Sequence, residues 1–552
     1  MKTDFNYRRR RSCEVNVGGI PMGGDNPVRV QSMTSTSTMD TEGSVAQIKR
    51  IVEAGGEYVR LTAQGVREAA NLSEIKAGLR ADGVNVPLVA DIHFNPKAAF
   101  EAAARVEKVR INPGNFVDPG RVFKKIDYTD EEYAAELRRI DDALVPFLDL
   151  CRRNGTAIRI GVNHGSLSDR IMSRYGDTPA GMVESAMEFL RVCRRNDFNN
   201  VVISIKASNV AVMVETVRRM VAALEAEDMD YPLHLGVTEA GDGEDGRVKS
   251  AVGIGTLLAE GIGDTIRVSL SEDPEFEIPV AKQLVDYVAS FARAGHIDGE
   301  IYGDYDHIRP LRRKSRWADR QPAVVGADIM PQNLKDAITA DSENGVEPYA
   351  ADMAADPEQP VVLSSGSFFR IGSMQAFLHE MMRRGLENPV ILKNTYKGLS
   401  SEETTLRASV DFGTLLMNGF CDGIWLETDS LSNDDCVRVS FSILQAARLR
   451  MTKTEFISCP SCGRTLYDLQ STLREIKAAT SHLKGLKIGV MGCIVNGPGE
   501  MADADYGYVG AGVGRVSLYK GKQCVLKNIP TSEAIPRLIE LIKENGDWTD
   551  PQ

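Results

Sequence analysis

The stretch PLVADIHFNPKAAFEAAARVEKVRINPGN, residues 87–115, holds two short apolar runs separated by an alanine-rich segment. The segment between the runs has the composition of an amphipathic helix, so this order predicts a βαβ unit with parallel strands. On both sides of this stretch, the same alternation of apolar runs and helical segments continues, from Val28 to Ser269. The sequence therefore predicts an α/β fold built on a parallel sheet.

Eight such runs can be counted. They begin at Val28, Tyr58, Pro87, Lys108, Ala157, Val201, Pro232 and Thr265. Eight strands with intervening helices within about 270 residues match the size of a closed (β/α)8 barrel. An open doubly wound sheet is the alternative, but no G-x-G-x-x-G motif opens a helix after the first strand. We therefore predict an N-terminal TIM barrel over residues 1–297.

Size and composition limit the class of protein. A chain of 552 residues exceeds one ordinary core, and we expect three domains in a globular protein with 43% apolar and 26% charged residues. No run of 18 uncharged apolar residues occurs, and the N-terminus lacks the apolar segment of a secretory signal. We expect a cytoplasmic protein without membrane contact. The net charge of −12 argues against nucleic-acid binding, and Arg8 to Arg11 is interpreted as a solvated basic segment.

The composition of the region after the barrel predicts a linker at its start, the polar stretch YGDYDHIRPLRRKSRW at residues 302–317. Beyond it, residues 410–427 match residues 252–269 of the barrel at eight of eighteen positions. Arg267 and Ser269 of the barrel correspond there to Trp425 and Glu427, so the copy keeps packing residues and loses polar ones. Residues 298–447 are predicted to form a barrel-like α/β insert with a structural role. Chance similarity between βα units is the alternative.

Basic side chains occur at the same phase near the ends of five runs, because residues two apart on a strand share a face. They are Arg60, Arg110, Arg159, Lys206 and Arg267. Polar residues on the same faces are Asn112, Asn163, Ser208 and Ser269. Such a cluster of cations is favourable when an anion completes it, and the guanidinium fork suits phosphate oxygens. In this fold functional residues gather at the carboxyl ends of the strands, so we predict a ligand with two phosphates there.

Acids and bases are predicted at the same rim. Asp91 and His93 lie in the ADIHF motif, and Glu239 lies in GVTEAG. Each of these residues could instead make only structural hydrogen bonds. We expect Glu239 to be a general acid, because nearby cations and an anionic ligand would tune its protonation.

The cysteines form an odd set of nine, of which three stand apart from the apolar segments. Cys459 and Cys462 form a C-x2-C motif, and Cys493 and Cys524 follow at intervals of thirty-one residues. This spacing fits zinc, with Cys524 or His482 as a fourth ligand, or an iron–sulfur cluster. The Pro- and Gly-rich turns favour a cluster, and Glu500 in NGPGE is a candidate oxygen ligand. We predict an α+β metal domain over residues 448–552.

Several motifs together resemble a known family. MTSTSTMDTEGSVAQI, ADIHF, VRINPGN, IRIGVNHGSL, GVTEAG, IRVSLS, FISCPSCGRT and VMGCIVNGPGE are similar to motifs of the 4-hydroxy-3-methylbut-2-enyl diphosphate synthases. These are reductive enzymes of the methylerythritol phosphate route to isoprenoids. The resemblance covers about residues 10–295 and 440–530. It implies a [4Fe–4S] cluster on Cys459, Cys462, Cys493 and Glu500, phosphate binding by the five cations, an acid at Glu239, and Asn496 facing the substrate.

The resemblance also implies a substrate and partners. The family's substrate is 2-C-methyl-D-erythritol 2,4-cyclodiphosphate, and its electrons come from ferredoxin or flavodoxin. The insert resembles that of a longer three-domain form, and the N-terminus lacks a plastid transit peptide, so we expect a bacterial chain. Shorter relatives pair the barrel of one chain with the cluster domain of another, so a homodimer is an alternative to closure within one chain. Rival interpretations are a pterin-binding barrel methyltransferase and a zinc-ribbon binding module.

Overall fold

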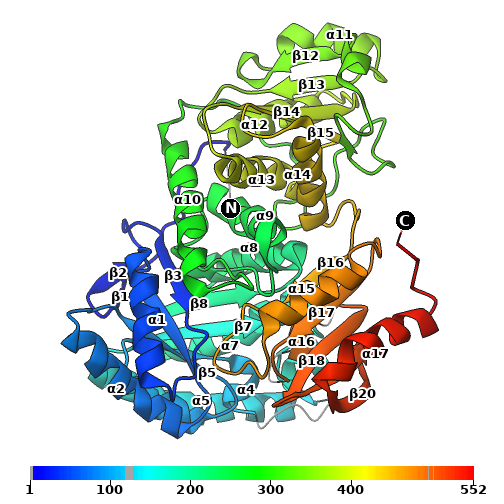
Figure 1. Cartoon of the computed structure of the whole chain (residues 1–552). Helices are drawn as coiled ribbons and strands as arrows, with labels where there is room; N and C mark the ends of the chain where they lie inside the picture. The colour runs from blue at the N-terminus through cyan, green and yellow to red at the C-terminus, as the bar shows by residue number, and fades with distance from the viewer. Residues whose placement is uncertain (1–3, 119–127, 495–496, 502, 552) are drawn as a thin grey trace. The chain divides into compact units, whose positions relative to one another are not determined.

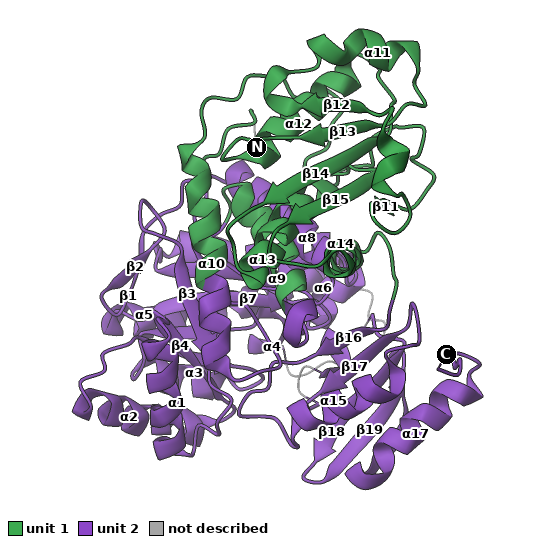
Figure 2. Cartoon of the chain, turned by 45° about the horizontal axis from the view of Figure 1, so that its top comes forward, with its two compact units in different colours: residues 1–10, 247–262, 282–452 green, residues 11–246, 263–281, 453–552 purple. Residues whose placement is uncertain are grey.

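The computed structural model describes residues 4–118, 128–494, 497–501 and 503–551 (Figure 1). Its contacts divide the chain into two compact units (Figure 2). Unit 1 comprises residues 1–10, 247–262 and 282–452, and unit 2 comprises residues 11–246, 263–281 and 453–552. None of the described helices is long and apolar enough to cross a membrane.

Unit 2 contains a closed barrel of eight parallel strands. In chain order the strands are β3 (Arg29–Met33), β4 (Tyr58–Ala63), β5 (Leu88–Ile92), β6 (Lys108–Ile111), β7 (Ala157–Asn163), β8 (Val201–Lys206), β9 (Leu233–Leu235) and β10 (Thr265–Ile266). Each strand pairs with its neighbour in sequence, and β10 pairs with β3 to close the ring. The eight predicted runs all contain these strands, so the prediction of a (β/α)8 barrel is confirmed.

Helices follow the strands, and several of them begin at residues that cap a helix or favour its first turn. They are α1 (Thr41–Glu53), α2 (Val66–Ala81), α3 (Pro96–Ala103), α4 (Pro113–Phe116), α5 (Asp130–Asn154), α6 (Asp169–Arg174), α7 (Pro179–Arg195), α8 (Val210–Ala226), α9 (Gly243–Ala259) and α10 (Glu277–Ala289). Asp40 caps α1 by accepting a hydrogen bond from Gly43 N, and Thr129 forms a capping box with Glu132 at α5. Proline follows the capping residue in α3 and α7, where it costs no hydrogen bond.

A short hairpin, β1 (Val15–Val17) and β2 (Ile20–Met22), packs at the amino ends of the strands. Val15, Val17 and Met22 are buried in one apolar cluster with Tyr58, Val89, Ala157 and Val202. Tyr58 and Ala157 are the first residues of β4 and β7. The hairpin therefore closes the bottom of the barrel and leaves the carboxyl ends of the strands as its open side.

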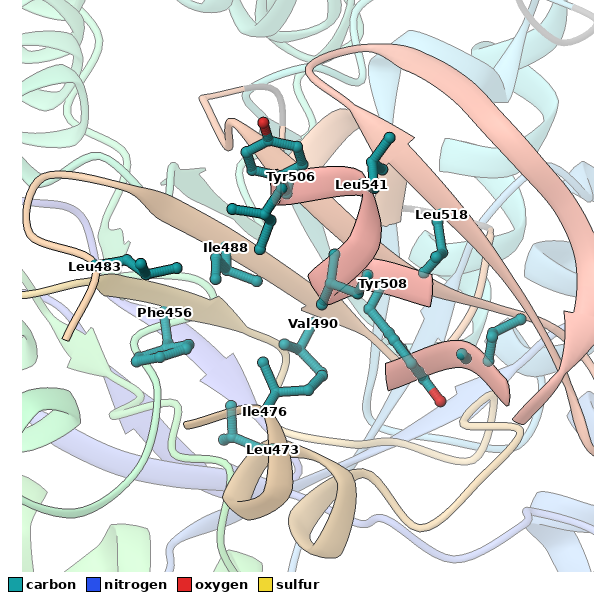
Figure 3. Close-up of a cluster of buried hydrophobic side chains, with 14 residues drawn as sticks. Phe456, Leu473, Ile476, Leu483, Ile488, Val490, Tyr506, Tyr508, Leu518 and Leu541 are labelled. Carbon is teal, nitrogen blue, oxygen red and sulfur yellow. The ribbon is translucent and has the colours of Figure 1, made fainter. Parts of the chain in front are cut away.

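The cysteine-containing segment of unit 2 forms a five-stranded sheet in sequential order. Its strands are β16 (Glu455–Ser458), β17 (Lys487–Met491), β18 (Tyr506–Gly512), β19 (Arg515–Lys520) and β20 (Gln523–Pro530), and its helices are α15 (Leu469–Thr480), α16 (Gly497–Glu500) and α17 (Thr531–Glu544). β16, β17 and β18 pair in parallel, and β19 pairs antiparallel with both β18 and β20. Phe456, Leu473, Ile488 and Tyr508 pack in its apolar core (Figure 3). This is the α+β arrangement that the sequence predicts.

Unit 1 contains an open sheet of five parallel strands. The strands are β11 (Ala323–Val324), β12 (Ile338–Asp341), β13 (Val361–Ser364), β14 (Val390–Tyr396) and β15 (Gly423–Thr428), in the order β11-β15-β14-β13-β12. Its helices are α11 (Ala350–Ala355), α12 (Arg370–Arg383), α13 (Ser401–Met417) and α14 (Asn433–Ala446). Four strands that follow one another in sequence are neighbours in the sheet, as they are in a barrel, but the ring does not close.

The two copies of the internal repeat contact each other through α9 and α13 in unit 1. A Cβ atom added to Gly413 of α13 would lie 2.9 Å from Val252 Cγ2 of α9, and one added to Gly255 would lie 2.6 Å from Val410 Cγ2. Val252 is aligned with Val410 in the repeat, and Gly255 with Gly413. The two helices therefore make the same contact in both directions, as across a twofold axis. Each glycine is needed because its partner valine occupies the space of a side chain.

Candidate functional site

Unit 2 contains a cavity at the carboxyl ends of the barrel strands, with a volume of about 720 Å³ that includes its open mouth. The barrel and the cysteine-containing domain both contribute to its walls. Predicted site residues that line it are Arg60, Asp91, His93, Arg110, Arg159, Asn163, Lys206, Glu239, Arg267, Ser269, Cys459, Cys462, Cys493 and Glu500. The structure thus brings together in one place residues that span more than four hundred positions of sequence.

Two predicted residues that the structure describes, Asn112 and Ser208, are not among those lining the cavity. Asn112 caps α4 by accepting a hydrogen bond from Gly114 N, and its Nδ2 donates to Ser166 Oγ over 3.1 Å. Ser208 Oγ donates to the backbone oxygen of Glu500 over 3.1 Å. Asn112 and Ser208 therefore contact the chain around the cavity rather than its interior. Asn496 lies outside the described residues.

Asp91 lies at the centre of the cationic group. Its Oδ1 is 3.2 Å from Arg110 Nη1 and 3.7 Å from Arg159 Nη2, and its Oδ2 is 3.7 Å from Arg464 Nη1. Burial alone would raise the pKa of Asp91, but Arg110 and Arg60 outweigh it and hold the pKa well below its usual range. Asp91 is therefore ionised and partly compensates the cations.

Asp91 does not neutralise all of the cations that line the cavity. Burial and the neighbouring arginines lower the pKa of Arg159 and of Lys206 well below the ordinary values. For Arg60, burial lowers the pKa to about 10 despite the attraction of Asp91. These shifts mean that the folded chain holds its cations at an energetic cost. An anion that enters the cavity would remove that cost, which makes the site suited to a phosphate-bearing ligand.

Arg267 and Arg60 differ in their partners. Arg267 Nε and Nη2 each donate to the buried carboxylate of Glu277 over 2.9 Å, and Glu277 also accepts from Ser32 Oγ over 2.6 Å. Arg60 Nε instead contacts the sulfur of Met33 over 3.0 Å. Arg267 is therefore fixed by a buried ion pair, whereas Arg60 makes no hydrogen bond to a carboxylate among the described residues.

His93 is neutral at the rim of this group. Burial and the adjacent Arg110 lower the pKa of His93 well below its usual value. Its Nε2 lies against Arg110 Nη1. Because a guanidinium can only donate, Nε2 must be the acceptor, and the ring hydrogen is assigned to Nδ1.

Glu239 has the environment of a protonated acid. Burial, and then the proximity of Glu500, raise the pKa of Glu239 well above its usual value. Its backbone has a φ of 50°, in the left-handed region that a non-glycine residue adopts at a cost. The next residue, Ala240, forms a parallel β-bridge with Ser458, directly before Cys459. The loop that carries the predicted acid is thus tied to the strand that leads into the cysteine motif.

The predicted metal ligands line the cavity from two loops, which carry the three cysteines, and from α16, which ends at Glu500. Cys459 Sγ accepts a hydrogen bond from Gly492 N over 3.3 Å, and burial and Cys462 raise the pKa of the Cys459 thiol well above its usual value. A bound metal would reverse that shift, since metal coordination deprotonates a thiol. Glu500 Oε1 accepts from Asn163 Nδ2 over 2.6 Å. Cys524 lies on β20, where its Sγ contacts Leu526 O, and it does not line the cavity.

The four predicted ligands share one cavity. The three thiols and the Glu500 carboxylate all line it. Within the ranges that the structure describes, no three His, Cys, Asp or Glu side chains form a site for a single metal ion.

Contacts within unit 2 join the two sides of the cavity. Lys477 forms an ion pair with Asp242, and Lys453 forms one with Asp245 over 2.5 Å, both in the segment after Glu239. Close to the predicted ligand Glu500, a Cβ added to Gly165 would lie 2.2 Å from Gly499 O. The glycines there allow the two backbones to touch. These contacts join the barrel and the cysteine-containing domain within unit 2.

The main residue that the sequence analysis missed is Arg464. It lines the cavity, is almost fully buried, and its Nη2 donates to Asp91 O over 3.2 Å. Although burial opposes it, the nearby Cys462 and Asp91 raise the pKa of Arg464. The available signal was its position two residues after Cys462, where a cation faces any anionic centre that the cysteines hold.

Two family models match the parts of the chain whose residues line this cavity. The GcpE TIM-barrel domain model matches residues 12–282, and the GcpE protein C-terminal domain model matches residues 455–544. The chain is similar to 4-hydroxy-3-methylbut-2-en-1-yl diphosphate synthase (flavodoxin) from Bacteroides fragilis, with 55% identity over 99% of this chain and 97% of the relative. The protein of that name from Phocaeicola vulgatus is 54% identical over 99% of both chains. The one from Leptospira interrogans is 40% identical over 100% of this chain and 99% of the relative.

A solved structure of dihydropteroate synthase from Xanthomonas albilineans matches 51% of this chain and 99% of its own, with 17% identity and a TM-score of 0.27. A similarity at this level supports no functional argument. The two domain models and the relatives matched along nearly their whole length lead to one conclusion, which is that this chain belongs to the GcpE family of 4-hydroxy-3-methylbut-2-enyl diphosphate synthases.

Proposed function

We propose that this chain catalyses the reductive ring opening and dehydration of 2-C-methyl-D-erythritol 2,4-cyclodiphosphate to 4-hydroxy-3-methylbut-2-enyl diphosphate. The observation that carries the proposal is the composition of one cavity, which is lined by cations, by Glu239, whose pKa is raised by burial, and by three cysteines. Relatives at 54% and 55% identity bear the name of this synthase. The chain is accordingly an iron–sulfur oxidoreductase of isoprenoid-precursor synthesis.

The cofactor that these residues suit is a [4Fe–4S] cluster held by Cys459, Cys462, Cys493 and Glu500. When bound, it supplies single electrons and an iron that is held by a carboxylate in place of a fourth thiolate. Asn163 would orient that carboxylate through the hydrogen bond to Oε1. Gly492 N, which donates to Cys459 Sγ, would stabilise the thiolate form of that ligand.

The barrel residues would bind and orient the substrate. Arg60, Arg110, Arg159, Lys206 and Arg267 line the cavity and would hold the diphosphate as it becomes a leaving group. Binding would replace water around the phosphates by fixed donors and would offset the cost of burying the cations. Glu239, protonated in its buried position, would donate a proton to the departing hydroxyl, which leaves as water.

We propose that an external protein delivers the electrons, and the lack of a nucleotide fingerprint for NAD(P)H in the sequence agrees with this. The names of the relatives specify flavodoxin, so we propose flavodoxin, with ferredoxin as the alternative. We further propose a cytoplasmic location, since thiolate ligands need a reducing compartment. The cavity walls from one chain support closure within a single chain, and a homodimer is then not required for the site.

Metal analysis of anaerobically purified protein tests the cofactor and separates the rival interpretations. Iron and acid-labile sulfide should each be present at roughly four per chain. Cys459→Ser and Cys493→Ser should lose most of both, whereas Cys151→Ser, at a buried position outside the cavity, should retain them. Stoichiometric zinc without sulfide would instead support a zinc-binding module and would contradict the proposal.

A further inference from the structure

A second layer of polar side chains lies in the barrel interior below the phosphate-binding cations. Lys108 is two residues before Arg110 on β6, and Ser204 is two residues before Lys206 on β8, so each shares the inward face of a residue that lines the cavity. His234 on β9 is in register with Ser204. We call Lys108, Ser204 and His234 the floor layer. All three are buried.

Several hydrogen-bond donors in the floor layer and on the adjacent Arg159 have no acceptor within the described part of the chain. Among the residues that the structure describes, none forms a hydrogen bond with Lys108 Nζ, Ser204 Oγ, His234 Nε2 or Arg159 Nε. Arg159 Nη1 lies 3.2 Å from His234 Nδ1, and since a guanidinium only donates, the hydrogen of His234 is assigned to Nε2. His234 Nε2 is therefore a further unpaired donor. A layer with this surplus of donors favours an added negative charge nearby.

Lys108 contributes the only amine of this layer. Its side chain is fully buried, and its Nζ lies 4.5 Å from the centre of the Tyr58 ring. The titratable or charged groups around it are Tyr58 and Arg60 on β4, Arg159 on β7 and His234 on β9. No carboxylate pairs with it within the described ranges. Burial, and then Arg159 and Arg60, lower the pKa of Lys108 well below its usual value.

We propose that Lys108 is a reserve cation of the anion site, neutral while the cavity is empty and protonated when a diphosphate binds to Arg110 and Arg159 above it. This inference rests on the proposed function, because it needs the diphosphate. The lone pair of Nζ takes one proton from the solvent, and the ammonium returns it when the ligand leaves. The negative charge of the ligand favours the charged amine, while the tyrosine ring beneath it can face a cation.

The sign of the pH dependence follows from this proton uptake. If binding takes up one proton at Lys108, affinity for the diphosphate falls by about tenfold per pH unit above the pKa of the amine in the empty protein. The decline ends above the higher pKa that the amine has in the complex. Below both pKa values Lys108 is charged in both states and contributes no slope.

Calorimetric titration of the holoenzyme with the cyclic diphosphate tests the inference. Titrations near neutral pH in two buffers of different ionisation enthalpy give the number of protons taken up on binding. The wild type should take up more protons than Lys108→Met, by a difference approaching one, and the variant should lose the corresponding slope of affinity with pH. Lys522→Met, at an exposed position outside the cavity, should behave like the wild type.

Stability measurements exclude a merely structural role. Methionine has nearly the length of lysine and removes a buried amine without a partner, so Lys108→Met should melt at the same or a higher temperature than the wild type when no ligand is present. Lys108→Gln provides a second neutral variant, with the same expected loss of proton uptake. Equal proton uptake in the wild type and in either folded variant would overturn the inference, as would a lower melting temperature of both variants. Failure of the wild type to bind the diphosphate would instead contradict the proposed function.

Discussion

Asn163 Nδ2 donates a hydrogen bond of 2.6 Å to Glu500 Oε1. The other end of the same amide, Asn163 Oδ1, accepts from Arg110 Nη2 over 3.2 Å. One side chain at the end of β7 thus links a phosphate-binding cation to the carboxylate that we propose as the fourth cluster ligand. The position of that carboxylate therefore depends on the barrel as well as on its own domain.

Replacing Asn163 by alanine should lower turnover more than it lowers stability. Loss of a hydrogen bond to a charged group costs about 1.5–3 kcal/mol, so kcat/KM should fall by roughly ten- to a hundredfold. Steady-state kinetics with iron content measured in parallel would check this, with Asn85→Ala, at an exposed position, as the control. Unchanged kinetics in Asn163→Ala would show that the link to Glu500 has no role in the reaction.

Arg60→Met and Arg267→Met form a matched pair with different expected effects on folding. If Arg267 only bound phosphate, its replacement would remove affinity and leave the melting temperature unchanged. The ion pair with Glu277 changes that prediction, because a buried carboxylate without its partner costs about 3–5 kcal/mol. Arg267→Met should therefore lower the melting temperature and the affinity together.

Arg60→Met should lose about 1.5–3 kcal/mol of affinity for the cyclic diphosphate while its melting temperature stays equal or rises, because Arg60 forms no hydrogen bond to a carboxylate among the described residues. Thermal melts with and without ligand would separate the two variants. Equal destabilisation by both substitutions would contradict the distinction drawn from Glu277.

Glu500 and Cys524 can be compared as the fourth cluster ligand. Cys524→Ser should keep cluster and activity, since Cys524 does not line the cavity. Glu500→Ala should lose most activity, and Glu500→Cys should hold a cluster but turn over poorly, because thiolate binds iron more tightly than carboxylate does. Iron content and turnover of the three variants check this. Loss of the cluster in Cys524→Ser together with full activity in Glu500→Ala would reverse the assignment.

The sequence predicts features that depend on residues close together in the chain, and it does not predict contacts between distant segments. The barrel strands and the phase of Arg60, Arg110 and Lys206 depend on local alternation, which the sequence displays. The bonds of Arg464 to Asp91 and of Arg313 to Asp422 join segments 373 and 109 positions apart, and no local pattern predicts such pairs. Asn112 is predicted as a ligand residue because it shares a face with Arg110, and the structure shows that its side chain also caps α4, which strand alternation does not predict.

Mixing two inactive chains tests whether one chain forms the whole site. Glu239→Gln lacks the proposed acid, and Cys493→Ser lacks a proposed cluster ligand. Because both residues line one cavity formed by unit 2 of the same chain, the mixture should not recover activity. A mixture with wild-type protein at the same total concentration controls for inhibition. Recovery of activity on mixing would show that the site forms between chains.

Product formation is the decisive measurement for the proposed reaction. Anaerobically purified protein is incubated with 2-C-methyl-D-erythritol 2,4-cyclodiphosphate and reduced flavodoxin, and the products are identified by mass spectrometry. The wild type should form 4-hydroxy-3-methylbut-2-enyl diphosphate, and Glu239→Gln should form much less of it with the substrate still bound. The proposed reaction is wrong if protein that contains a complete iron–sulfur cluster and binds the cyclic diphosphate leaves it unconverted with reduced flavodoxin and with reduced ferredoxin.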